Sequence, residues 1–155
     1  PLREAATGLF SYLSMWPLLI ASLLLTMLLC TIFHISPNSG THPIVPFLVA
    51  TSDPLVITLT FLLAAIVAPI TEEIFFRGVL YYYLRSSLSA PLAMLLSGFI
   101  FALVHPQGLI GLIPLTPIGC VLAFLREWRH SLLASMVTHG LVNAVTLFLA
   151  LSLMS

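Results

Sequence analysis

Long apolar runs, broken by short polar stretches, are the dominant pattern of this sequence. The runs cover residues 9–33, 54–85, 91–105, 108–125 and 132–154. A helix of about 20 apolar residues crosses the hydrocarbon core of a bilayer. Backbone groups in lipid must find their hydrogen-bond partners within the chain, which favours helices. The pattern therefore predicts an all-α fold, a multispanning transmembrane helix bundle with about five spans.

The longest polar break separates the first two runs. It covers residues 34–53 and carries the sequence PNSGTHP at 37–43. Clusters of Pro, Gly, Asn and Ser are typical of loops. We therefore expect a loop here, with the side chains of His34 and His42 in water.

Two of the runs are unusual for single straight helices. The run 54–85 would form about 48 Å of helix at 1.5 Å per residue. Because this exceeds the thickness of the hydrocarbon core, we expect the helix to tilt, to kink at Pro69 or to protrude. The run 108–125 contains Pro114 and Pro117, which predict an irregular span.

The composition agrees with a membrane protein. Only ten of 155 residues are charged, 6% against roughly 25% in soluble domains, and 60% are hydrophobic. So little polar surface excludes a soluble globule. The net charge is zero and no basic run occurs, so we expect membrane lipids as partners and no nucleic acid.

The five arginines predict the orientation of the bundle. With Arg3 in the cytoplasm and five spans, Arg85, Arg126 and Arg129 all fall at cytoplasmic ends, as the positive-inside rule requires. Residues 126–130 are expected to form an interfacial loop, and the tyrosines at 81–83 to belong to the aromatic belt. Only Arg77 lies within a span.

Arg77 shares its span with two carboxylates, Glu72 and Glu73. Glu73 and Arg77 are four residues apart, so they lie on one helix face and can pair. A structural ion pair that holds helices together is the plainest explanation of such charges. It leaves Glu72 unexplained, because one carboxylate suffices for one arginine, and an ionisable residue at membrane depth is a functional candidate.

Two further polar pairs lie in later spans, Phe101 with His105 and His139 with Asn143. Counting about 1.5 Å per residue from the cytoplasmic helix ends puts Glu72 and His105 at about 20 Å, Asn143 at about 17 Å and His139 one turn lower. We therefore expect these side chains to meet. A glutamate and an imidazole can take a proton from water, and Asn and His can bind a developing oxyanion.

These three motifs, EExxxR at 72–77, FxxxH at 101–105 and HxxxN at 139–143, resemble those of the CAAX protease and bacteriocin-processing family, which includes the Ras-converting endoprotease. The resemblance covers about residues 55–148. It implies a catalytic core there, preceded by an N-terminal transmembrane helix and loop at 1–54.

By this resemblance the protein would be a multi-pass membrane endopeptidase, with its site towards the cytoplasmic half. Its substrate would be a membrane-associated or lipidated protein or peptide. The resemblance implies that Glu72 and His105 activate water and that His139 and Asn143 stabilise the oxyanion. It further implies that Glu73, Arg77 and Phe101 shape the site.

Alternative chemistries are limited by the residues present. Asp53 is the sole aspartate, so a two-aspartate protease is excluded, and no HExxH zinc motif occurs. No cofactor is expected, although Glu72, His105 and His139 are competent zinc ligands. A catalytically silent scaffold or bacteriocin-immunity-type protein of the same fold, and a small proton-coupled transporter, remain as alternatives.

Overall fold

The computed structural model describes residues 1–36 and 42–154, and every regular element in these two ranges is helical. The α-helices are α1 (Leu2–Ser14), α2 (Trp16–Ile32), α3 (Ile44–Ala50), α4 (Pro54–Leu62), α5 (Ala68–Glu73), α6 (Tyr81–Arg85), α7 (Ala90–Leu103), α8 (Gly108–Arg129) and α9 (Leu133–Met154). Two π-helical segments, η2 (Leu63–Val67) and η3 (Ile74–Leu80), join α4, α5 and α6. The all-α multispan prediction is confirmed.

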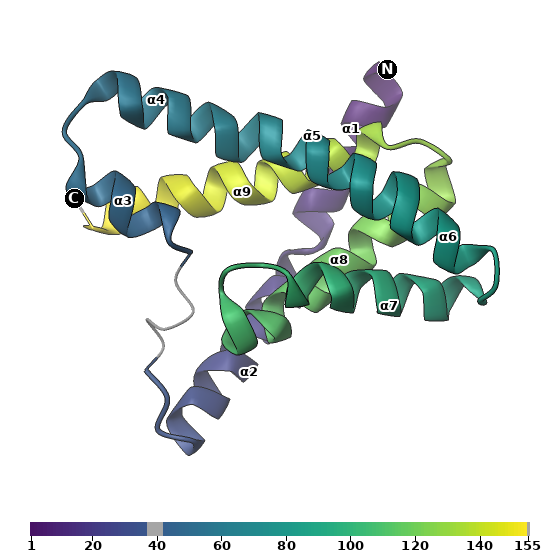
Figure 1. Ribbon diagram of the computed structural model, residues 1–155, viewed down its shortest axis with the longest axis horizontal. Helices are drawn as coiled ribbons and strands as arrows, with labels where there is room; N and C mark the ends of the chain where they lie inside the picture. The colour runs from purple at the N-terminus through teal and green to yellow at the C-terminus, as the bar shows by residue number, and fades with distance from the viewer. Residues whose placement is uncertain (37–41, 155) are drawn as a thin grey trace.

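The helix from α4 to α6 is a continuous rod beside α9, with α7 below it in the view of Figure 1. It runs from Pro54 to Arg85, 32 residues, as the apolar run predicts. The Asp53 carboxylate caps its start by accepting a hydrogen bond from the Leu55 N–H at 2.9 Å. The helix passes Pro69 without a break. Its two π-helical segments directly precede and follow α5, which carries the two glutamates.

The first predicted span, 9–33, corresponds to two helices. The chain forms α1 and α2 here, bent by 40° at Met15. Pro17 stands in the first turn of α2, where its missing N–H costs nothing, so the sequence favours a new helix start at this point.

The α1 helix packs tightly on α9. A Cβ atom at Gly8 would come within 2.7 Å of the Ala134 carbonyl oxygen, so only glycine permits this approach. The Thr138 hydroxyl donates to the Gly8 carbonyl oxygen at 3.0 Å. Residues outside the predicted core thus support the helix that carries His139.

The helices α7 and α8 differ from the prediction in opposite ways. The expected third span, 91–105, is a helix of only 14 residues that ends at Leu103. Pro106 disfavours a helical conformation for the residue before it, so His105 lies in the following turn. The expected irregularity in the fourth span is absent, because α8 continues through both prolines. It packs along α7 and α2, and this packing outweighs the two lost backbone donors.

The predicted loop at 34–53 contains a short helix, α3, which the polar pattern did not indicate. Val45 and Leu48 of α3 are buried against Leu147 of α9, so packing rather than local preference explains this helix. The part of the loop at 37–41 lies outside the described residues.

Within the described ranges, three helices are long and apolar enough to cross a membrane, or four if the bent pair α1–α2 counts as one span. The difference from the predicted five comes mainly from α7, which is too short by this criterion. The protein is a multispanning helical membrane protein.

Candidate active site

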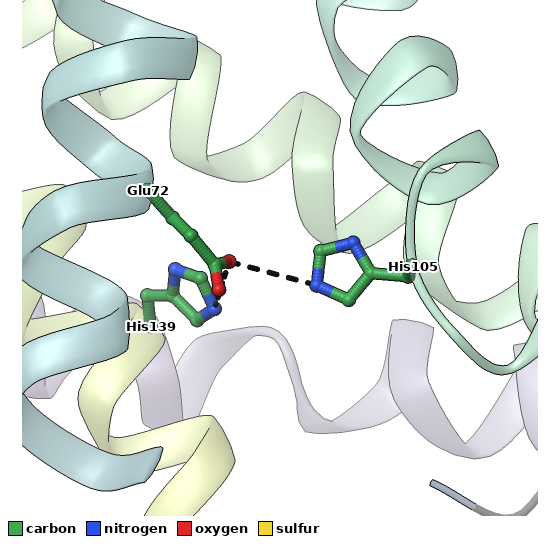
Figure 2. A group of neighbouring side chains, drawn as sticks. All are labelled: Glu72, His105 and His139. Atoms are coloured by element: carbon green, nitrogen blue, oxygen red, sulfur yellow. Dashed lines mark ion pairs between the residues drawn. The ribbon is translucent and has the colours of Figure 1, made fainter. Parts of the chain in front are cut away.

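Three polar side chains from separate parts of the chain converge at one point. Glu72 comes from α5, His105 from the turn after α7, and His139 from α9. The Glu72 Oε2 atom lies 3.6 Å from His105 Nε2 and 3.7 Å from His139 Nε2. Figure 2 shows both imidazole rings turned toward this carboxylate from two sides.

Each of the two imidazoles uses its Nδ1 atom in a hydrogen bond, and this bond shows where the ring proton lies. The Nδ1 atom of His105 lies 2.6 Å from the Phe101 carbonyl oxygen, which only accepts, so Nδ1 carries the proton. The Nδ1 atom of His139 lies 3.0 Å from Glu73 Oε1 and likewise donates. In their neutral forms both rings therefore present an Nε2 lone pair to Glu72.

A buried ion pair lies next to this cluster. Glu73 Oε1 accepts a hydrogen bond from Arg77 Nη1 at 2.8 Å, and both side chains are fully buried. The Nη2 atom of Arg77 donates to the Gly119 carbonyl oxygen at 2.9 Å. The predicted pairing of Glu73 with Arg77 is confirmed. Because Glu73 also binds His139, this carboxylate connects the arginine to the candidate site.

Phe101 fills the space between these groups. Its ring centroid lies 4.1 Å from that of His105 and 5.4 Å from that of His139. The guanidinium carbon of Arg77 lies 4.6 Å from the same centroid, within range of a cation–π interaction. Phe101 thus packs beside the site, as the motif implies.

Close backbone contacts fix how the helices around the site pack against one another. A Cβ at Gly119 of α8 would lie 2.6 Å from the Gly98 Cα of α7, so the two helices meet where neither residue has a side chain. This crossing fixes the carbonyl group that Arg77 binds. At Gly140, next to His139, a Cβ would lie 2.7 Å from the Ala65 carbonyl oxygen, so α9 approaches η2 equally closely.

A sequence profile of the family described as type II CAAX prenyl endopeptidase Rce1-like matches residues 54–145. The match covers more than half of the chain and includes all three motifs. The chain belongs to this family. No curated protein and no solved structure matches the chain.

Membership of the Rce1-like family places the candidate residues in a membrane protease family, while the structure shows which of them meet. Glu72, His105 and His139 come together. Asn143, one turn further along α9, donates from Nδ2 to the Ala64 carbonyl oxygen at 3.0 Å and does not bind the other three. The expected meeting of these three side chains is confirmed, although the count of helical rise placed His139 lower than Glu72. Such a count includes neither the tilt of a helix nor the reach of a side chain.

The three converging groups form a donor set suited to a metal ion. Their ligand atoms all lie within 4.8 Å of one another. One carboxylate and two imidazoles with a fourth position left open are typical of catalytic zinc, and zinc-bound histidines usually donate their other N–H to an oxygen acceptor. The two separations from Glu72, 3.6 and 3.7 Å, are close to the about 3.4 Å between ligands of tetrahedral zinc. The set as a whole extends to 4.8 Å, so the side chains would have to move closer together to bind an ion.

Sequence reasoning missed one residue near the site, His42. It was expected in water, but its side chain is half-buried and its Nδ1 accepts a hydrogen bond from the Ile44 N–H at 3.1 Å. Burial lowers the pKa of His42; the nearby His105 acts in the same direction, and Glu72 opposes it. His42 is therefore within electrostatic reach of the candidate site. Its position in a polar loop gave no signal of this.

Proposed function

We propose that this chain is an intramembrane endopeptidase that hydrolyses a peptide bond of a membrane-associated or lipidated protein or peptide. Membership of the Rce1-like family supports a hydrolase at the level of the family. The distribution of arginines supports a site towards the cytoplasmic half of the membrane.

The observation that carries this proposal is the environment of the Glu72 Oε2 atom. It is buried and has no hydrogen-bond partner among the described residues, while two imidazole nitrogens face it. The Glu72 side chain as a whole is 31% exposed, so the group is accessible from outside. A buried, unpartnered acceptor on a partly exposed side chain, with two imidazole nitrogens beside it, is suited to bind a water molecule when the neighbouring groups move to admit it.

In the proposed mechanism, Glu72 takes a proton from this water as the water oxygen attacks the substrate carbonyl carbon. The Nε2 atom of His105 accepts the second hydrogen of the water and orients it. When the tetrahedral intermediate collapses, the carbon–nitrogen bond breaks and Glu72 returns its proton to the leaving amine.

The oxyanion of that intermediate would be bound by His139 and Asn143. Because Nδ1 of His139 already donates to Glu73, its Nε2 donates only if the ring carries a second proton. The hydrogen bond from Nδ1 to Glu73 Oε1 orients the ring. Asn143 has a second amide hydrogen beyond the one given to Ala64. Glu73 would then act as a positioning residue for His139.

The test is the Glu72→Gln variant. Membrane proteins from cells that express the wild type or this variant are compared by mass spectrometry, and a peptide spanning any differential cleavage site is then assayed with purified protein. Glutamine keeps the shape of the side chain but cannot take the proton, so we expect cleavage to fall by about 10²-fold or more.

The matched control is Glu127→Gln, which changes a carboxylate away from the site. It should retain cleavage activity. Near-wild-type cleavage by Glu72→Gln, in protein that inserts and purifies normally, would exclude Glu72 as the base. Absence of any wild-type cleavage product would favour the silent scaffold instead.

A further inference from the structure

A cavity lined by charged and aromatic side chains lies far from the candidate active site, at the ends of α6 and α8. Its volume is about 240 Å³, and it is lined by Tyr81, Tyr82, Arg85, Arg126, Glu127 and His130. Arg85 is 13 residues beyond Glu72 on the same continuous helix, which corresponds to about 20 Å. No part of the proposed hydrolysis uses this cavity.

The cavity carries an excess of positive charge. Its one carboxylate, Glu127, accepts hydrogen bonds from the Tyr81 hydroxyl at 2.9 Å and from Arg85 Nε at 3.1 Å, so its charge is compensated. The side chains of Arg126, Tyr82 and His130 make no hydrogen bond or ion pair within the described part of the chain. An unpaired guanidinium, an imidazole and a hydroxyl therefore face the same space.

The neighbouring charges do not change this balance. On the next turn of α8, Arg129 binds Glu4 of α1 through two hydrogen bonds, of 2.6 and 3.1 Å, and this pair is neutral. Among the described residues that line the cavity, Arg126 is the cation that no carboxylate pairs with. A ligand that neutralises it must be an anion.

The cavity lies where helix ends gather. The α6–α7 and α8–α9 turns lie on the same side of the molecule, the right side of Figure 1. Beside the cavity, Tyr83 and Trp128 are 73% and 53% exposed, as expected for aromatic residues at a membrane–water interface. Anionic lipid headgroups are concentrated at this level, and guanidinium groups bind phosphate in forked geometry.

We propose that this cavity binds the phosphate of an anionic phospholipid headgroup, with Arg126 as its main contact. Tyr82 would add a hydroxyl donor and His130 an imidazole donor. The outward face of α8, where Phe124 and Trp128 are exposed, would lie along the acyl chains. The site would tie the ends of α6 and α8 to the lipid surface.

The test is a titration of the purified full chain in detergent, followed by native mass spectrometry. Phosphatidylglycerol and phosphatidylcholine with identical acyl chains are compared, and inorganic phosphate is added in a third arm. We expect preferential binding of phosphatidylglycerol that millimolar phosphate does not displace. Arg126→Gln should weaken it roughly tenfold, the effect of losing one charge-assisted contact.

The matched control is Arg3→Gln, since Arg3 is an exposed arginine of α1 outside the cavity. It should leave binding unchanged. Tyr82→Phe, which removes only a hydroxyl from an exposed side chain, should weaken binding severalfold even if Arg126→Gln misfolds. Equal loss in Arg3→Gln, or equal binding of both lipids, would overturn the proposal. Displacement by inorganic phosphate would assign the cavity to soluble phosphate instead of lipid.

Discussion

Removing the carboxylate of Glu73 should destabilise the protein more than any change on its surface. In Glu73→Ala, Arg77 keeps its charge in a fully buried position but loses the partner 2.8 Å away. Breaking a buried pair in this way costs about 3–5 kcal/mol. The hydrogen bond to Gly119 and the contact with the Phe101 ring remain, but neither neutralises the charge, so they offset the loss only in part.

At about 2–4 °C per kcal/mol for a chain of this size, the expected decrease in Tm is on the order of 10 °C. It is measured by heating purified protein in detergent and following the monodisperse fraction by size-exclusion chromatography. The control, Glu127→Ala, breaks the partly exposed pair with Arg85 and the hydrogen bond from the Tyr81 hydroxyl, and should cost less, about 1–2 kcal/mol.

A double variant separates the stability effect from catalysis. Glu73→Ala with Arg77→Met removes both charges, so it should regain much of the lost stability, since an apolar pair of similar volume often replaces a buried ion pair. Cleavage should stay low, because His139 still lacks the partner of its Nδ1. If Glu73→Ala melts like the wild type and loses only turnover, Glu73 is the chemical carboxylate and our assignment is reversed.

Three further experiments test other parts of the structure. If hydrolysis is metal-free, chelators should leave cleavage intact and purified protein should lack stoichiometric zinc; one ion per chain whose removal stops cleavage, and whose return restores it, would establish a zinc site instead. The pKa of His42 is lower in the folded protein than in the unfolded chain. Near and below the ordinary histidine pKa of about 6.5, the unfolded chain therefore binds more protons than the folded protein does, and stability should fall on acidification. The loss of stability between pH 7.5 and 5.5 should be smaller in His42→Gln than in the wild type, and His34→Gln should behave like the wild type. Equal pH profiles of stability for the wild type and His42→Gln would refute this role of His42. Gly119→Ala should cost about 1–3 kcal/mol by forcing α7 and α8 apart, whereas Gly78→Ala, whose new Cβ has no neighbour closer than 3.6 Å, should be nearly neutral in the same melting assay.

Local features of this fold could be predicted from the sequence. The pairing of Glu73 with Arg77 follows from their spacing on one helix, and the 54–85 helix follows from an unbroken apolar run. The gathering of Glu72, His105 and His139 was also predicted, because three polar positions at similar membrane depth have few other ways to avoid lipid. Their catalytic roles stay predictions.

Features set by contacts between distant segments could not be predicted. The hydrogen bond between Glu73 and His139 joins residues 66 positions apart, and no periodicity indicates it. The helical path of α8 through two prolines depends on how α7 and α2 pack against it. The helix α3 lies in a polar segment and owes its existence to a contact with α9.

The continuous helix from Pro54 to Arg85 has a consequence for how the bilayer influences the site. A 32-residue helix measures about 48 Å, and fitting it within a hydrocarbon core of about 30 Å requires a tilt of about 50°. Tilting reduces the depth of Glu72 below the surface at Arg85 from about 20 Å to about 13 Å. A bilayer of shorter acyl chains increases the tilt and brings the carboxylate closer to bulk water. For a helix that tilts rather than protrudes, lipid chain length therefore changes how far Glu72 lies from bulk water.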